Sequence, residues 1–144
     1  MKYLIAILFL SAPAFAGVNT DLGSIEYIAS RAAYDTSLAN AYWYFGDVQR
    51  REKWRKSARA LSCKGLRVAK RITRVTSTDD TRGIVEDFDD CCRYLSGENE
   101  YRGQNRSKWG DCKIYLRHAQ STAICLLTGK KVCNIHNIGL PRLP

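Results

Sequence analysis

The sequence predicts an all-α fold: a small disulfide-stapled bundle of about four helices that follows a cleaved signal peptide. Apolar residues recur at helical spacing in four stretches, and no stretch alternates in the manner of a half-buried strand. Six cysteines follow an N-terminal leader of secretory type, which favours a disulfide framework. We therefore expect residues 1–16 to be the signal peptide and residues 17–144 to be a single helical domain, with a loose C-terminal tail from about residue 134.

The leader has the three parts of a secretory signal. Lys2 supplies the positive charge, residues 4–10 form an apolar run, and Ala14 and Ala16 flank Phe15 in a small-x-small cleavage site. We expect the mature chain to begin at Gly17 and to be secreted into a bacterial periplasm. No later segment has the roughly 18 to 20 consecutive apolar residues that cross a bilayer, so we expect no transmembrane segment in the mature chain.

Charge is distributed in blocks of alternating sign. The whole chain has a formal net charge of +9. Residues 49–75 hold eleven basic side chains and one acidic side chain, whereas residues 76–100 hold two basic and eight acidic ones. A basic protein suggests an anionic partner such as a protein, a polymer, a membrane surface or a nucleic acid. Alternating blocks also allow the chain to neutralise part of its own charge on folding.

The first helix is expected from about Asp21 to Phe45, with apolar residues in two stripes that predict contacts on two sides. Thr20 or Asp21 can cap its start, and Gly46 suits the left-handed position that ends a helix. Residues 42–45, Tyr-Trp-Tyr-Phe, have the highest aromatic density of the chain. They are either core residues with one exposed ring or a contact surface for a partner.

A long basic helix is expected after Asp47, which can cap it, up to about residue 75. Gly65 lies in its apolar seam, where it either permits close approach of another helix or divides the segment into two shorter helices. Cys63 projects about 180° from that seam, in the middle of the basic face, so another element should cover it. The seam consists of Trp54, Ala58, Leu61, Gly65, Val68, Ile72 and Val75.

Two shorter helices complete the expected bundle. An acidic helix is predicted from about residue 84 to 95, and the last helix from about 111 to 129, with a loop over residues 98–110 between them. Their inner faces are predicted to be Ile84, Phe88, Cys92 and Leu95 in the first, and Cys112, Tyr115, Leu116, Ala119, Ala123 and Leu126 in the second.

Geometry limits the fifteen pairings that six cysteines allow. Adjacent Cys91 and Cys92 rarely bond to each other, because disulfide geometry needs a larger separation of the two Cα atoms. Cys112 and Cys125 lie too far apart along one helix to meet. Cys125 and Cys133 are separated by a helix-ending glycine, so we expect a bond between them.

Cys63 and Cys112 are then left to pair with the two adjacent cysteines, in either order. A bond from Cys63 to the acidic helix would join the basic and acidic blocks of the chain, and each such bridge contributes roughly 2 to 4 kcal/mol. This docking would place Glu86, Asp87, Asp89 and Asp90 beside Arg59, Arg67 and Lys70.

Candidate catalytic residues are few. The chain has two histidines, His118 and His136, and a secreted nuclease could use them with Lys113 as acid, base and phosphate clamp. That chemistry requires residues distant in sequence to converge on one cleft. We expect no metal site and no cofactor, because cysteines in an oxidising compartment are bonded rather than available as thiolate ligands.

Residues 89–92, Asp-Asp-Cys-Cys, resemble the D-x-C-C opening of the calcium-dependent secreted phospholipases. That family continues C-C-x-x-H-D, and the positions of its catalytic His and Asp are Leu95 and Ser96 in this chain. The glycine-rich calcium loop of the family is also absent from the sequence. The sequence therefore excludes that activity.

A second pattern is similar to that of small secreted lysozyme-inhibitor-like helical proteins, D-x-x-L-N-x-x-Y followed by Gln, Trp, Arg and Cys. The Asn stands at position 40 here, and the gap between Tyr42 and Gln49 is shorter than that family uses, so the pattern assigns no family. The residues that match are Asp35, Leu38, Tyr42, Gln49, Trp54, Arg59 and Cys63.

Three functional hypotheses follow from these observations. The first is a non-enzymatic envelope binding protein, such as an inhibitor or regulator of an envelope enzyme, which engages an anionic partner. The second is a small basic hydrolase that uses the two histidines, and the third is a structural accessory of a secretion or lysis apparatus. The absence of a recognisable catalytic constellation in the sequence favours binding. The predicted surface comprises Arg50, Arg51, Lys53, Arg55, Lys56, Trp43 and Tyr44.

Overall fold

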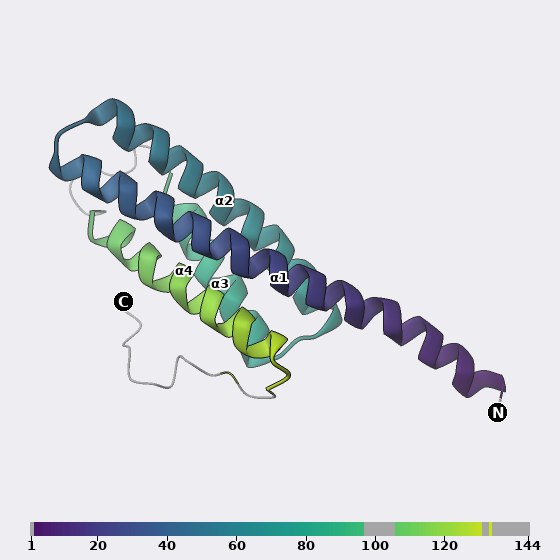
Figure 1. Cartoon of the computed structure of the whole chain (residues 1–144). Helices are drawn as coiled ribbons and strands as arrows, with labels where there is room; N and C mark the ends of the chain where they lie inside the picture. The colour runs from purple at the N-terminus through teal and green to yellow at the C-terminus, as the bar shows by residue number, and fades with distance from the viewer. Residues whose placement is uncertain (1, 97–105, 131–132, 134–144) are drawn as a thin grey trace.

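Four helices run alternately up and down in a computed structural model that describes residues 2–96, 106–130 and 133. Side chains are described from residue 16 and, after the gap at residues 97–105, from residue 109. The helices are α1 (Lys2–Tyr44), α2 (Val48–Val75), α3 (Asp79–Tyr94) and α4 (Arg106–Leu127) (Figure 1). The described residues contain no strand. The predicted all-α bundle is thereby confirmed.

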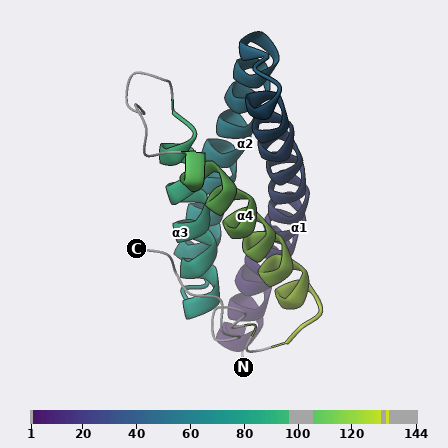
Figure 2. The ribbon, with the colours of Figure 1, turned by 90° about the vertical axis from the view of Figure 1, so that its left-hand side faces the viewer.

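The helices form a closed ring of neighbours. α1 packs against α2 and α4, α3 packs against the same two helices, and the two diagonal pairs make no contact among the described residues. Figure 2 shows the four helices grouped in this way. The largest side chains fully buried between them are Phe88, Ile25, Ile72, Ile84, Leu95 and Leu116.

α1 is longer than the sequence predicts. It begins at Lys2 instead of near Asp21, because the apolar stretch of the predicted leader continues the same helix. Among the described side chains, which begin at residue 16, half-buried Val18 and buried Leu22 are the first that pack against the core. An apolar leader forms a helix whether or not it is later removed, so its cleavage stays a prediction. Among the described residues, no helix combines the length and the apolar character needed to cross a membrane.

Tight turns connect the first three helices. Gly46 has a φ of +70°, which favours glycine, and the side chain of Asp47 then accepts a hydrogen bond of 3.0 Å from the backbone N–H of Arg50. Thr78 and Thr81 exchange hydrogen bonds in a capping box, so α3 begins at Asp79, five residues before the predicted start.

α2 is a single helix that passes through Gly65 without a break. A Cβ atom at this position would lie 2.2 Å from the Phe88 ring of α3, a distance that real Cβ atoms do not show. Gly65 therefore permits the close approach of α2 and α3, which is the first of the two predicted roles.

Two disulfides hold the bundle. Cys63 is bonded to Cys92, which joins α2 to α3 as expected, and Cys125 is bonded to Cys133. The first bond resolves the pairing order that the sequence leaves open. Cys91 and Cys112 are free thiols, so the structure has two disulfides instead of the predicted three. The sulfur of Cys91 lies 3.5 Å from the carbonyl oxygen of Cys112, and that thiol donates to the carbonyl in place of a covalent bond.

Candidate binding surface on helix α2

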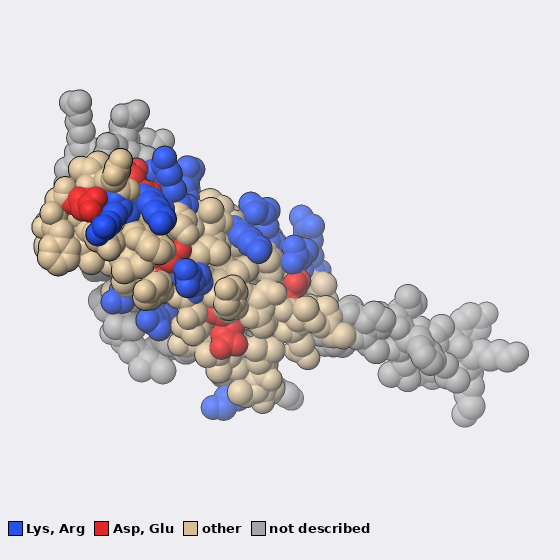
Figure 3. Space-filling view, turned by 45° about the horizontal axis from the view of Figure 1, so that its top comes forward, with Lys and Arg blue, Asp and Glu red and all other residues tan. Residues whose placement is uncertain are grey.

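The outward face of α2 is cationic along the whole helix. The side of the helix that packs on α1 and α3 carries Ala58, Gly65, Val68 and Ile72. At 100° per residue, eight of the nine exposed cations lie on the opposite side of the helix, within an arc of about 140°, and Arg50 on the first turn widens the arc to about 180°. We call this set the cationic face, and its nine residues are Arg50, Lys53, Lys56, Arg59, Lys64, Arg67, Lys70, Arg71 and Arg74. Figure 3 shows Lys and Arg gathered over this side of the molecule.

Three members of the cationic face also contact neighbouring helices. The Arg50 guanidinium lies 5.6 Å from the centre of the Tyr42 ring of α1. Arg71 forms an ion pair with Asp21 of α1 at 2.9 Å, and this pairing raises the pKa of Arg71. Arg59 donates a hydrogen bond of 3.3 Å to the carbonyl oxygen of Cys92, beside the disulfide. These contacts fix the rotation of α2 about its axis, so that the other cations face solvent.

The acidic helix α3 forms ion pairs with its own arginines. Arg93 pairs with Asp89 and Asp90, and Arg82 pairs with Asp79. The covalent part of the predicted docking between the basic and acidic helices is therefore confirmed. The accompanying pairing of the α3 carboxylates with Arg59, Arg67 and Lys70 stays a prediction.

The structure divides the predicted surface residues into two sets. The exposed set is Arg50, Lys53, Lys56 and Tyr44. The buried or half-buried set is Arg51, Arg55 and Trp43. The residues of the second set contact other parts of the protein. They therefore hold the helices in place and do not themselves form the accessible surface.

Arg55 is only 4% exposed, although the sequence places it among the basic residues of the surface. Its Nη1 donates a hydrogen bond of 2.5 Å to the carbonyl oxygen of Leu95, which directly follows the last residue of α3. The last carbonyls of a helix have no partner within the helix, and they favour a positive charge. Arg55 therefore caps α3, and a partner cannot reach it.

Glu52 holds the Arg55 guanidinium in place. Its carboxylate accepts hydrogen bonds from Nε at 3.0 Å and from Nη2 at 2.7 Å. Burial by itself would raise the pKa of Glu52, but the hydrogen bond from Arg55 and the charges of Arg55, Arg51 and Lys56 outweigh it and lower the pKa. The carboxylate is ionised at neutral pH and neutralises part of this end of the helix.

Arg51 and Trp43 belong to an aromatic stack that joins α1, α2 and α4. The Arg51 guanidinium lies 4.4 Å from the centre of the Trp43 ring, a cation–π contact, and Trp43 meets Trp109 edge to face at 5.4 Å. The indole N–H of Trp109 in turn donates to the carbonyl oxygen of Tyr94. Burial in this stack explains why Trp43 does not form part of the accessible surface.

The turn between α1 and α2 exposes apolar side chains. Tyr44 is 76% exposed, Phe45 81% and Val48 54%. One of the two interpretations of the aromatic segment predicts a single exposed ring, whereas the structure exposes two. Phe45 and Val48 are absent from the predicted surface, although their position on either side of Gly46 and Asp47 could have indicated it. We call Tyr44, Phe45 and Val48 the apolar tip.

The predicted catalytic residues do not converge among the described residues. Lys113 is exposed and His118 half-buried on α4, and five residues of separation place them about 140° apart around the helix. His136 lies outside the described residues. In the part of the chain that the structure describes, no group of three or more His, Cys, Asp or Glu residues could hold a metal ion.

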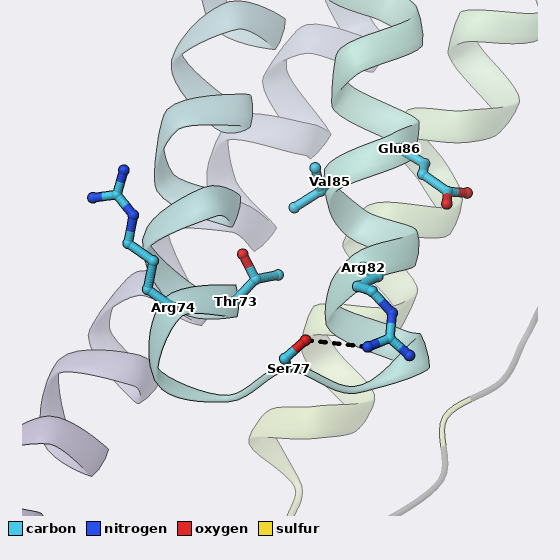
Figure 4. A pocket seen from close by; sticks show the side chains of 6 residues that line it. All are labelled: Thr73, Arg74, Ser77, Arg82, Val85 and Glu86. Carbon is cyan, nitrogen blue, oxygen red and sulfur yellow. Dashed lines mark hydrogen bonds between the residues drawn. The ribbon is translucent and has the colours of Figure 1, made fainter.

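A shallow depression at the far end of α2 and α3 does not form a ligand site. Arg74 and Arg82 are the cations among its lining residues, and Figure 4 shows that they point away from each other. Arg82 donates to Ser77 at 3.1 Å and also pairs with Asp79. Two guanidinium groups directed apart cannot clamp one anion.

Comparison with known proteins finds no matching protein family, no matching curated protein and no matching solved structure.

Proposed function

We propose that the mature chain is a secreted, non-enzymatic binding protein of the bacterial envelope that engages an anionic partner through the cationic face of α2. The observation that supports this proposal is the row of nine exposed cations on one side of a single 28-residue helix. A helix of that length spans about 42 Å, so the face suits an extended anionic surface better than a small ligand. An inhibitor or regulator of an envelope enzyme is the most specific form of the proposal.

The geometry gives the hydrolase hypothesis no comparable support. Lys113 and His118 point to different sides of α4, and no described pocket contains either residue. The two candidate functions differ in what they need: binding through the cationic face depends on charge and salt, whereas hydrolysis depends on His118 and His136.

Charge reversal tests the proposal directly. We expect the triple variant Lys64→Glu, Arg67→Glu and Lys70→Glu to bind its native envelope fraction on the order of tenfold more weakly at low salt. The matched control reverses three cations outside α2, with Lys113→Glu, Arg117→Glu and Lys130→Glu. Equal binding of the two triple variants at every salt concentration would refute the proposal.

Recovery of the protein from its source tests the localisation. We expect the protein from the periplasmic fraction to begin at Gly17, as read by intact mass and N-terminal sequencing. A chain that retains Met1 and fractionates with the cytoplasm would contradict the secretory part of the proposal.

A further inference from the structure

We infer that the apolar tip inserts into the interface of an anionic lipid bilayer. This inference rests on the proposed function and names the partner of one end of the same surface. Tyr44, Phe45 and Val48 lie within five residues of one another around one short turn, and all three side chains are exposed. Three apolar side chains of this size exposed together at a turn indicate a contact surface.

The tip lies at a projecting end of the bundle. α3 has 16 residues and α2 has 28, and the two helices are joined by a short turn at their other ends. Residue Arg55 of α2 already lies level with the end of α3, because it caps Leu95. The first turns of α2 and the last turn of α1 therefore extend past α3, as Figures 1 and 2 show.

A projecting apolar turn is suited to insertion into the interface of a lipid bilayer. The described pockets lie elsewhere, one near the far ends of α2 and α3 and one beside Tyr27 and Tyr34 of α1. Neither of these two pockets is lined by a residue of the apolar tip. Aromatic side chains prefer the boundary between headgroups and acyl chains, which matches the position of Tyr44 and Phe45.

Charge beside the tip selects an anionic bilayer. Arg50, Lys53 and Lys56 are exposed on the first turns of α2, directly behind the tip. Asp47 caps α2 and also pairs with Arg50 at 3.6 Å, and Glu52 binds Arg55, so Lys53 and Lys56 supply the positive charge that no described ion pair offsets. Basic side chains next to an inserted aromatic segment bind anionic headgroups at the depth that the aromatic residues set.

Vesicle binding tests this inference. We expect the mature protein to sediment with vesicles that contain phosphatidylglycerol and not with vesicles of phosphatidylcholine alone. The double variant Tyr44→Ala and Phe45→Ala should bind roughly tenfold more weakly. Tyr27→Ala is the matched control, because Tyr27 is 71% exposed on another part of α1, and it should bind normally.

Insertion depth gives a second readout. A tryptophan at the tip, Phe45→Trp, should be quenched by brominated lipids, whereas Tyr27→Trp should not. Charge-dependent sedimentation that the double variant leaves intact would overturn insertion of the tip. Failure to bind any anionic vesicle would overturn the bilayer as partner, and charge reversal of residues 64, 67 and 70 would still decide the proposed function separately. Retention on an envelope protein that is lost in the double variant would identify a protein occupant instead.

An independent observation concerns the two free thiols. We also propose that Cys91 and Cys112 are an oxidation site, where a disulfide forms between α3 and α4 as the chain folds in the presence of a disulfide oxidant. Both residues are fully buried, the Cys91 sulfur lies 3.5 Å from the carbonyl oxygen of Cys112, and Cys92 next to Cys91 is already bonded to Cys63. The existing disulfide fixes the register of α3, which keeps Cys91 directed at α4.

The oxidation is a two-step thiol–disulfide exchange. One thiol loses its proton, attacks a sulfur of the oxidant, such as oxidised glutathione, and releases one glutathione thiol. The second cysteine then displaces the other glutathione, so the pair loses two protons and two electrons and the oxidant becomes two thiols. In the folded protein, burial and contact with Cys112 raise the pKa of Cys91 well above its ordinary value, which slows attack. We therefore expect the two thiols to be oxidised during folding, before they are buried.

Thiol counting tests this site. We expect chain refolded from the reduced state in a glutathione redox buffer to take no maleimide after denaturation, and a peptide map to join Cys91 to Cys112. Cys112→Ser should leave one reactive thiol. Two maleimide adducts that map to Cys91 and Cys112 in the refolded wild-type protein would overturn the proposal.

Discussion

The role of Arg55 in the structure differs from the role that the sequence predicts for it. In the sequence it stands among eight cations of residues 50–67, and nothing distinguishes it from Arg50 or Lys56. In the structure it binds Glu52 and the end of α3, and its charge is used inside the protein. Buried ionic contacts of this kind are expensive to break, because removal of one partner leaves the others buried without compensation.

Replacement of Arg55 should therefore destabilise the protein. We expect Arg55→Ala to lower the free energy of unfolding by about 2 to 3 kcal/mol, since the Leu95 carbonyl loses its donor and the Glu52 carboxylate keeps only the longer contact with Arg51 at 3.6 Å. Lys56→Ala is the control on the next residue and should change the free energy by less than about 0.5 kcal/mol. Urea unfolding followed by circular dichroism measures both values. Equal effects of the two variants would contradict the capping role.

Glu52 should make stability depend on acid pH. Its pKa in the folded protein is below the ordinary value of 4.5, so its contribution is present above pH 4.5 and is lost as the pH falls through the folded pKa. We expect the stability of the wild-type protein to fall more steeply below about pH 4.5 than that of Glu52→Gln, which has no carboxylate to protonate at this position. Identical slopes for the two proteins in urea unfolding between pH 5 and pH 3 would rule this contribution out.

At the scale of elements, the contact between α2 and α3 depends on a missing side chain. Gly65 allows the Phe88 ring to approach the α2 backbone, and the disulfide between Cys63 and Cys92 lies close by in sequence on both helices. Helical periodicity identified the seam and the place of the glycine in it. It could not identify Phe88 as the neighbour, because the facing residue depends on how two helices are placed side by side.

Alanine at position 65 should be unfavourable despite its better helix propensity. We expect Gly65→Ala to destabilise the protein by about 1 to 2 kcal/mol, because the new methyl group overlaps a fully buried ring. Gly23→Ala is the control inside α1, where a Cβ meets nothing within 4 Å, and it should stabilise by up to about 1 kcal/mol. Thermal unfolding of the two variants gives the comparison, and stabilisation by both would show that α2 and α3 can separate without cost.

At the scale of the whole molecule, the described contacts between α1 and the core begin just after the predicted leader. Val18 and Leu22 are the first side chains described in contact with the core, and Asp21 forms the ion pair with Arg71. The segment that α1 adds before them extends away from the other three helices (Figure 1). The mature start at Gly17 and the start of the stable domain stay predictions.

Two truncations test this boundary. We expect a chain that begins at Gly17 to unfold cooperatively at a high temperature, because it keeps every core contact described for α1. A chain that begins at Ile25 loses Val18, Asp21 and Leu22 and should unfold several degrees lower, in line with a loss of about 2 to 4 kcal/mol. Calorimetry of both chains gives the midpoints. A common midpoint would place the start of the stable domain after Leu22.

The sequence by itself determined the four amphipathic helices, the Cys125–Cys133 bond, the link from Cys63 to the acidic helix and the cationic side of α2. Those features follow from local periodicity, charge order and the reach of a disulfide, all of which are properties of a linear chain. The tertiary structure decided which cations of α2 face solvent, which aromatic residues form the tip, and that Cys91 lies against Cys112. These outcomes depend on how separate helices are placed relative to one another, for example on where α3, with 16 residues, ends beside α2, with 28 residues. The spacing of residues along one helix does not encode the distance from that helix to another.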